Sequence, residues 1–341
     1  MMKAVFYEGE RKLRIDDRER INPGAGEVEI KVAYAGICGT DLHIFHGHMN
    51  NRVSTPHVMG HEMSGVVSRV GEGVHQFKPG DRVTVMPLIS CGQCPACKDG
   101  FSHICHYLKF MGIETPGAFQ EYWVVPENTL RRLPDDLDLK YGALIEPLAV
   151  ACHDIRIGQV RQGDQVVVIG GGPIGTLIAL VARSAGAEVV VSEINPHRIR
   201  MLQDLGMETC NPKETNLTEY ITEKTRGRGA DVVFEVTSST AGAEVMTELP
   251  RTRGKIVIVG IFNKAVPVDL HRFFWRELQL FGARVYENED FDKAIQLATS
   301  GELPLDRLIT EVYPLNQIKN GFEQMETGGN VMKVLIQLHQ A

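Results

Sequence analysis

Residues 166–175 read Val166-Val-Val-Ile169-Gly170-Gly-Gly172-Pro-Ile-Gly175, and this run decides the fold of the second half of the chain. The four β-branched residues predict a buried strand, and the glycines behind them have the spacing G-x-G-x-x-G. In such a turn Gly170 permits the tight bend, Gly172 lets a pyrophosphate approach the backbone, and Gly175 allows the next helix to pack closely on the strand. The run therefore predicts a strand, a glycine turn and a helix whose N-terminus can bind phosphate.

An acidic residue at the end of the next predicted strand strengthens this interpretation. A glycine turn alone is weak support for a dinucleotide site, since glycine-rich strand ends also occur without a ligand. Here Glu193 lies 23 residues after Gly170. Its carboxylate could accept both adenosine-ribose hydroxyls and would repel a 2′-phosphate, which favours NAD over NADP. Arg198 could flank the adenine or be a solvated helix charge, so NADP use stays open.

The second half of the chain alternates between strands and helices. Apolar runs predict five strands: 165–169, 188–192, 231–236, 255–260 and 278–282. Helical patterns lie between and after them, at 174–184, 196–205 and 291–300. This alternation predicts a doubly wound parallel sheet with helices on both faces. The first 140 residues are instead rich in short Val-rich strands, and a last strand at 331–338 could return to them. We expect an α/β protein of two domains.

Cysteine spacing predicts a metal site in the first half. The chain has seven cysteines, and four of them lie within fifteen residues: Cys91, Cys94, Cys97 and Cys105. Four thiolates at this spacing can hold one Zn²⁺ in a closed tetrahedral site that orders a loop and leaves no open position for chemistry. Two disulfides or a chance cluster are the alternatives, but they fit the short, regular spacing less well. The pattern favours a reducing compartment.

The composition excludes several classes of function. The net charge of −7 argues against a nucleic-acid binder, which would show a basic stripe. The first residues, Met1-Met-Lys-Ala, carry a charge where a signal peptide needs an apolar core. Residues 166–182 are uncharged, but they contain several glycines and are short for a membrane span. We expect a soluble, cytoplasmic protein with no nucleic-acid or membrane partner.

A second group of residues has the ligand types of an open zinc site. Cys38 and His61 could supply sulfur and nitrogen, and Glu62 or Glu146 could supply a third ligand. Each residue also has a plain structural explanation, such as a buried cysteine, a core histidine, a surface charge or a helix-start carboxylate. Spacing alone does not decide between these interpretations.

The order of the motifs resembles the zinc-dependent medium-chain alcohol dehydrogenase family. Gly60-His61-Glu62-x-x-Gly65 is preceded by Cys38-Gly-Thr40-Asp-x-His43 and followed by the four-cysteine lobe. The resemblance covers the whole chain. It implies a GroES-like catalytic domain at 1–150, completed by 285–341, around a Rossmann NAD-binding domain at 151–284. It also implies two Zn²⁺ per subunit, a structural ion in the cysteine lobe and a catalytic ion held by Cys38 and His61.

The third catalytic ligand separates branches of that family. Liver-type alcohol dehydrogenases have a cysteine where this chain has Glu146, in a Leu144-Ile-Glu146-Pro147-Leu148 context similar to the sorbitol and polyol dehydrogenases. The resemblance implies that Glu62 or Glu146 binds the metal, or both in alternation. It further implies a proton relay through Thr40 and His43.

The resemblance also implies which residues bind the coenzyme and which reaction the protein catalyses. The cofactor-binding set is expected to include Ile174, Gly260 and Arg284 beside the glycine turn, Glu193 and Arg198. We expect NAD-dependent oxidation of a secondary hydroxyl in a polyol, sugar or sugar acid to a ketone, by a homo-oligomer that is a dimer or a tetramer. The alternatives are an L-threonine 3-dehydrogenase, a butanediol-type dehydrogenase and, from another class, a catalytically inactive NAD-binding regulatory protein.

Overall fold

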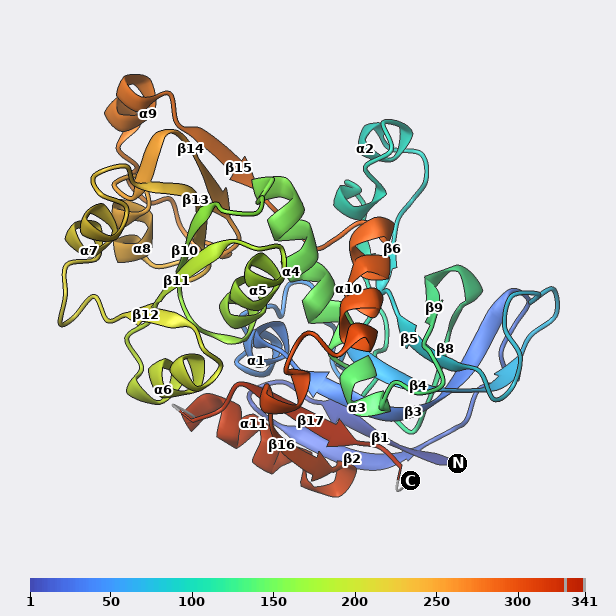
Figure 1. Cartoon of the computed structure of the whole chain (residues 1–341). Helices are drawn as coiled ribbons and strands as arrows, with labels where there is room; N and C mark the ends of the chain where they lie inside the picture. Colours follow the sequence, from blue (N-terminus) through green and yellow to red (C-terminus); the bar gives the residue numbers. More distant parts are fainter. Residues whose placement is uncertain (328–329, 340–341) are drawn as a thin grey trace. The chain divides into compact units, whose positions relative to one another are not determined.

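The chain divides into two compact units in the computed structural model, which describes residues 1–327 and 330–339. The first unit comprises Met1–Glu146, Ala294–Gly301 and Leu305–Ala341, and the second comprises Pro147–Lys293 and Glu302–Pro304. Figure 1 shows the course of the chain through both units. Within the described residues, no helix combines the length and the apolar character that crossing a membrane requires.

The second unit is built on a six-stranded, wholly parallel sheet. Its strands are β10 (Gln165–Ile169), β11 (Glu188–Ser192), β12 (Glu208–Cys210), β13 (Ala230–Glu235), β14 (Pro250–Ile258) and β15 (Gln279–Gly282). They lie in the order β12-β11-β10-β13-β14-β15, so the strand order reverses between β10 and β13. This is the Rossmann order, in which dinucleotides bind at the carboxyl ends of the strands beside the reversal.

Helices connect these strands, and most of them begin with a side-chain cap. They are α5 (Pro173–Ser184), α6 (Pro196–Asp204), α7 (Leu217–Lys224), α8 (Thr240–Val245) and α9 (Leu270–Arg276). α4 (Ile145–Gly158) precedes β10 and α10 (Asn288–Ser300) follows β15, and each of these two helices has residues in both units. At the start of α6, the Asn195 side chain accepts hydrogen bonds from the N–H groups of His197 and Arg198, and Pro196 occupies the first turn. Such caps satisfy N–H groups that have no partner inside the helix.

The first unit is β-rich, as the GroES-like resemblance implies. Its main sheet contains β3 (Glu27–Ile37), β4 (Glu62–Val70), β5 (Arg82–Val85), β8 (Tyr122–Pro126), β9 (Leu130–Arg132), β16 (Ile309–Pro314) and β17 (Lys333–Gln337). The order is β16-β17-β3-β4-β5-β9, with β8 also paired to β3. The strand pairs β1 (Met2–Tyr7)–β2 (Leu13–Arg18) and β6 (Leu88–Ile89)–β7 (Lys109–Phe110) lie beside it, with helices α1 (Gly39–Phe45), α2 (Pro95–Lys98), α3 (Leu139–Gly142) and α11 (Ile318–Thr327).

The C-terminal strand β17 is central to this sheet rather than an addition to it. It pairs antiparallel with β3, so that Val334 faces Ile37 and Leu335 faces Gly36. The side chains of Ile37, Val334 and Ile336 are fully buried in one core with residues from β3, β4 and β5. Residues more than 290 positions apart in the sequence are therefore neighbours in this sheet.

A buried ion cluster holds β3 to its surroundings. The Glu29 carboxylate is fully buried and accepts hydrogen bonds from both Arg20 and Arg69, including one from Arg20 Nη2 at 2.6 Å. Burial opposes ionisation of this group, but the two guanidinium groups outweigh burial and lower the pKa of Glu29 to about 2. The Arg20 guanidinium also lies over the ring of Tyr122 on β8, 3.7 Å from its centroid.

Candidate functional site

The glycine turn after β10 has the geometry that its sequence predicts. Gly170 has φ +108°, which L-residues rarely adopt, and Gly172 is the N-cap of α5. A Cβ on Gly175 would lie 1.8 Å from the carbonyl oxygen of Gly170, so only glycine fits there. The N-terminus of α5 follows at the reversal of strand order. This turn therefore provides the backbone approach and the unpaired N–H groups that a pyrophosphate requires.

Glu193 lies directly after β11, and backbone groups fix its carboxylate. Oε2 accepts the N–H of Gly171 at 2.9 Å, and Oε1 accepts the N–H groups of Ile194 and Asn195. The Arg198 guanidinium is 3.9 Å from the carboxylate. The acid is thus held rigidly against the glycine turn.

The other residues expected around the coenzyme are also in the second unit. Ile174 is half-buried in the first turn of α5, and Gly260 follows β14 with its N–H bonded to the Glu235 carbonyl oxygen. Arg284 is exposed just after β15 and precedes Val285, whose φ is +51°. A left-handed backbone at a β-branched residue is strained, and such strain often marks a functional segment.

The four-cysteine lobe brings its sulfur atoms together without disulfides. All seven cysteines are free thiols, and the four sulfurs of the lobe lie within 4.8 Å of one another. Cys94 Sγ is 3.5 Å from Cys97 Sγ and 3.8 Å from Cys105 Sγ. Ligands about 2.3 Å from a tetrahedral zinc ion would be about 3.8 Å apart. The spacing therefore fits Zn²⁺.

Electrostatics in the lobe also fit a cation. Burial opposes ionisation of Cys94, but backbone N–H groups that donate to its sulfur lower its pKa to about 6. Burial and the neighbouring thiols instead raise the pKa of Cys97 to about 12. Without a positive ion the four thiols cannot ionise together, because the thiolates repel one another. Zinc removes that repulsion and favours all four thiolates.

A second donor group lies in the first unit at the start of α1. Cys38 is the N-cap of this helix, and its sulfur accepts the N–H of Thr40 at 3.1 Å. The ligand atoms of Cys38, Asp41 and His61 lie within 4.8 Å of one another, as do those of His61, Glu62 and Glu146. The structure therefore collects the expected ligands around His61.

Acidic groups surround the buried ring of His61. Burial alone would lower the pKa of His61, but Cys38, Asp41 and Glu146 raise it well above the usual range. The Nδ1 atom of His61 and the Oδ1 atom of Asp41 have no hydrogen-bond partner and lie 4.0 Å apart. Buried polar atoms without partners and several anionic donors fit a site that binds a divalent cation.

Two residues of this group were not predicted from the sequence. Asp41 is fully buried and accepts the N–H of Cys38, which completes a capping box at the start of α1. Lys333 on β17 is also buried, and its Nζ atom lies 2.7 Å from each carboxylate oxygen of Glu62. The signal for Lys333 was a single lysine inside the apolar run Val331-Met-Lys-Val-Leu-Ile.

The expected relay residues lie on one helix. Thr40 and His43 are one turn apart on α1, with Thr40 half-buried and His43 exposed. Partial burial and the nearby His48 and His46 lower the pKa of His43. In the polar segment that follows α1, His46 contacts Glu326, and Arg52 bonds Glu114 with its Nε atom at 2.8 Å. Both side chains therefore already have carboxylate partners.

Comparison with known proteins agrees with this geometry. Residues 24–135 match the model of the alcohol dehydrogenase GroES-like domain, and residues 173–300 match that of the zinc-binding dehydrogenases. The chain belongs to the zinc-dependent medium-chain alcohol dehydrogenase family.

Its relatives include enzymes of sugar-acid and polyol metabolism. A 2-dehydro-3-deoxy-L-galactonate 5-dehydrogenase of Pseudoalteromonas atlantica is 50% identical over 336 residues, which is 98% of each chain. A sorbitol dehydrogenase of Halalkalibacterium halodurans is 32% identical, over 98% of this chain and 99% of its own length.

Solved structures show the same architecture with coenzyme bound. A zinc-binding dehydrogenase of Sinorhizobium meliloti 1021 in complex with NADP has a TM-score of 0.93 at 32% identity and covers 99% of both chains. A protein described as a short chain alcohol dehydrogenase of Escherichia coli CFT073, complexed with NADH, has a TM-score of 0.92 at 31% identity. It covers 98% of this chain and 99% of its own. These comparisons confirm the predicted family and the predicted fold class. They also confirm the prediction that the protein is an oxidoreductase that uses zinc and a nicotinamide coenzyme.

Proposed function

We propose that this protein oxidises a secondary hydroxyl of a polyol, sugar or sugar acid to a ketone, with a 2-oxo-3-deoxy sugar acid as the first candidate substrate. The main support for this proposal is the 50% sequence identity, over 98% of the chain, to the 2-dehydro-3-deoxy-L-galactonate 5-dehydrogenase of Pseudoalteromonas atlantica. Glutamate at position 146 supports a hydroxylated substrate, because a carboxylate accepts hydrogen bonds better than a thiolate does.

We infer that each subunit holds two zinc ions. The lobe of Cys91, Cys94, Cys97 and Cys105 would hold the structural ion, and the group around His61 would hold the catalytic one with Cys38 and a carboxylate. When bound there, zinc supplies a Lewis acid that favours the alkoxide form of the substrate hydroxyl. Asp41 would orient His61 through its free Nδ1 atom, as partners of ligating histidines commonly do.

The proposed proton path runs along α1. The Thr40 hydroxyl would accept the proton of the substrate hydroxyl while releasing its own proton toward the ring of His43, and His43 would pass a proton to solvent. Support comes from their spacing of one turn and from the exposure of His43. A lowered pKa keeps His43 neutral at pH 7, so its ring can accept a proton.

We propose NAD as the preferred coenzyme, with the Glu193 carboxylate facing the ribose hydroxyls. Three backbone N–H groups hold this carboxylate in place, so it cannot swing away from a 2′-phosphate without losing them. The half-exposed Arg198 beside it is the group that would favour NADP, and it is the reason to test both coenzymes. Gly170, Gly172, Ile174, Gly175, Gly260 and Arg284 complete the proposed coenzyme site.

A substrate panel tests the proposal. Reduced nicotinamide absorbance should follow oxidation of 2-dehydro-3-deoxy-L-galactonate, L-galactonate, sorbitol, L-threonine, 2,3-butanediol and ethanol with either coenzyme. We expect the highest kcat/KM for a sugar acid, at least about tenfold above ethanol, because unpaired buried acceptors penalise a plain alcohol. Glu146→Ala should lower kcat about tenfold or more. A best rate with ethanol or L-threonine would contradict the proposed substrate class.

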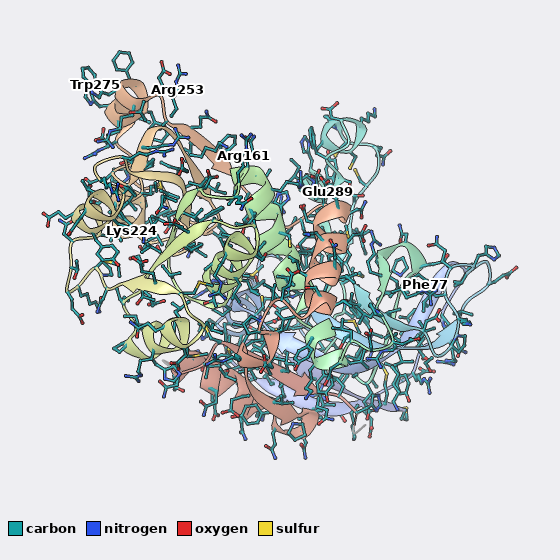
Figure 2. All side chains as sticks on the ribbon, viewed as in Figure 1. Phe77, Arg161, Lys224, Arg253, Trp275 and Glu289 are labelled. Atoms are coloured by element: carbon teal, nitrogen blue, oxygen red, sulfur yellow. The ribbon has the colours of Figure 1, made fainter. Side chains whose placement is uncertain are left out.

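We also propose that the protein is a homo-oligomer in the cytoplasm. β15 is the last strand of its sheet, and α9 before it exposes 80% of Phe274 and 73% of Trp275 (Figure 2). With Leu270 and Leu280 these side chains expose on the order of 500 Å², a large part of the roughly 800 Å² that each partner contributes to a standard interface. Light scattering should find a dimer or tetramer, and Phe274→Glu should dissociate it. Seven free thiols support a reducing compartment.

A further inference from the structure

Val285 has a backbone conformation that its own side chain disfavours. Its φ is +51°, and among the described residues it is the only β-branched one with a positive φ. Left-handed backbone is strained at such a residue, and the strain persists only where the surrounding structure fixes the chain. The fold must therefore contain contacts that hold position 285 in this conformation.

Val285 lies in the β15–α10 segment, which we define as residues 283–287. At the start of this segment, Ala283 donates its N–H at 3.0 Å to the carbonyl oxygen of Ile258, the last residue of β14. Arg284 follows and is exposed. The first end of the segment is thus tied to the carboxyl end of the parallel sheet.

The carboxylate of Asp290 fixes the other end of the segment. Asp290 is in the first turn of α10 and is 2% exposed, and its Oδ2 atom accepts the N–H of Glu287 at 2.9 Å. A side chain in the first turn that accepts the N-cap N–H is one half of a capping box. Directly before Glu287, the Tyr286 side chain is fully buried, with its ring centroid 5.3 Å from that of Phe291.

Two side chains of α4 hold the Asp290 carboxylate in turn. His153 Nδ1 lies 2.7 Å from Oδ2, and Arg156 donates from Nε to Oδ1 at 2.7 Å and from Nη2 to Oδ2 at 2.8 Å. Arg156 also contacts the carboxylate of Glu287. Burial opposes ionisation of Asp290, but these hydrogen bonds outweigh burial and lower its pKa. A buried charge with this many donors is costly to displace.

The β15–α10 segment lies at the end of the sheet where the coenzyme is expected. The glycine turn and Glu193 follow β10 and β11, on one side of the reversal of strand order. In a Rossmann sheet the second half of the dinucleotide binds at the carboxyl ends of the strands on the other side of the reversal, which here are β13, β14 and β15. The segment follows β15 and is bonded to the end of β14, so it can reach the nicotinamide half.

We propose that Asp290 is a positioning residue for the coenzyme, because with His153 and Arg156 it holds the β15–α10 segment in the strained conformation that binds the nicotinamide half. This inference rests on the proposed coenzyme site but not on the proposed substrate. Without Asp290 the backbone at Val285 would relax in the free protein, and coenzyme binding would have to restore the strained form. The apparent affinity then falls with the fraction of the protein that remains in the binding conformation.

Titration with NADH, followed by the fluorescence of the bound coenzyme, measures this affinity without any substrate. We expect Asp290→Asn to raise the Kd for NADH at least about tenfold. Asp231→Asn is the matched control, because Asp231 is also buried in the second unit and pairs with Arg228 and Arg251, but it lies near the amino end of β13. It should lower the melting temperature as well, but leave the Kd within about twofold.

Val285→Gly supplies the direct test of positioning. Glycine adopts a positive φ without strain, so the segment no longer needs Asp290 to keep that conformation. In the Val285→Gly background, Asp290→Asn should therefore raise the Kd for NADH about threefold or less. If Asp290→Asn does not fold, Arg156→Lys gives the same comparison, because lysine keeps the charge but cannot replace the planar fork that reaches Asp290 and Glu287 together.

Three results would overturn the proposal. An unchanged Kd in folded Asp290→Asn would show that this carboxylate does not act on the coenzyme. An equal loss of affinity with and without Val285→Gly would show that strain at position 285 is not what Asp290 holds. An equal loss in Asp231→Asn would make the effect one of general stability. Binding of NADH to the unchanged protein is measured first, so failure of the coenzyme site itself is detected separately.

Discussion

Replacing Glu29 by glutamine should destabilise the first unit by about 2–3 kcal/mol. The side chain is fully buried between two guanidinium groups, which lower its pKa from 4.5 to about 2. Each unit of pKa shift corresponds to about 1.4 kcal/mol, so ionised Glu29 contributes about 3 kcal/mol. Glutamine removes the charge but still accepts one hydrogen bond, which retains part of that contribution.

The effect has a defined pH dependence. A carboxylate whose folded pKa is depressed stabilises the protein above its unfolded pKa, and the stabilisation is lost as pH falls through the folded value. The difference between the two proteins should therefore be complete at neutral pH. It should begin to shrink below about pH 4.5 and decline toward pH 2, the window set by the two pKa values of Glu29.

The measurement needs a probe confined to the first unit. The chain has two tryptophans, and Trp123 is buried on β8 opposite Ile30 of β3. A Trp275→Phe background leaves Trp123 as the only tryptophan, so its fluorescence in urea reports unfolding around Glu29. The free energy of unfolding is then compared with and without Glu29→Gln.

A matched control separates the effect of burial on stability from the effect of ion pairing. Glu8 and Arg14 form an ion pair at the same 2.6 Å distance, but their side chains are 38% and 42% exposed. Glu8→Gln should cost less than about 1 kcal/mol, since exposed pairs contribute little. Equal losses from the two substitutions would refute the reasoning that burial makes the Glu29 cluster strong.

Three further changes test the sites. Cys94→Ala should lower the zinc content measured by elemental analysis from about two ions per subunit to about one and reduce stability, because a closed tetrahedral site needs all four thiolates. Metal-free native protein would contradict both zinc assignments. Glu193→Ala should raise kcat/KM with NADP relative to NAD, and an unmodified enzyme that already prefers NADP would count against the role of Glu193. His43→Ala should slow oxidation about tenfold to a hundredfold. A relay through neutral histidine predicts that the rate falls below about pH 6.5, and the substitution should abolish that fall. An unchanged pH profile would exclude this relay.

Much of the second unit could be predicted because its signals are local. The strands predicted at 165–169 and 188–192 have the same bounds in the structure, since each is a continuous apolar run ended by a glycine or a polar residue. The start of α6 followed from Pro196, and its end from Gly206, which has φ +75°. Capping and turn residues act over a few positions, so the sequence displays them directly.

Strand ends that depend on pairing were less predictable. The predicted strand 255–260 is β14, which begins at Pro250 and ends at Ile258. Its first residues are polar, and they extend the strand only because Pro250 pairs with Ala230 across an irregularity in the ladder. At its other end, Gly260 donates its N–H to the carbonyl oxygen of Glu235 on the neighbouring strand.

The candidate metal site was predictable as a set of ligands but not as an arrangement. Residue types and spacing made Cys38 and His61 candidates, and the resemblance to the zinc-dependent medium-chain alcohol dehydrogenase family assigned them to the metal. Lys333 could not be identified in this way, since a lysine in a strand usually lies on its solvent face. Its role depends on β17 pairing with β3, and no local sequence pattern predicts that long-range contact.

The ion pair between Glu62 and Lys333 also sets an order of events during synthesis of the chain. The four cysteines lie within fifteen consecutive residues, so their lobe can take up zinc soon after it leaves the ribosome. Glu62 must wait for a partner translated 271 residues later. The proposed structural metal can therefore bind early in synthesis, while Glu62 gains its counter-ion only when β17 has emerged and joined the sheet.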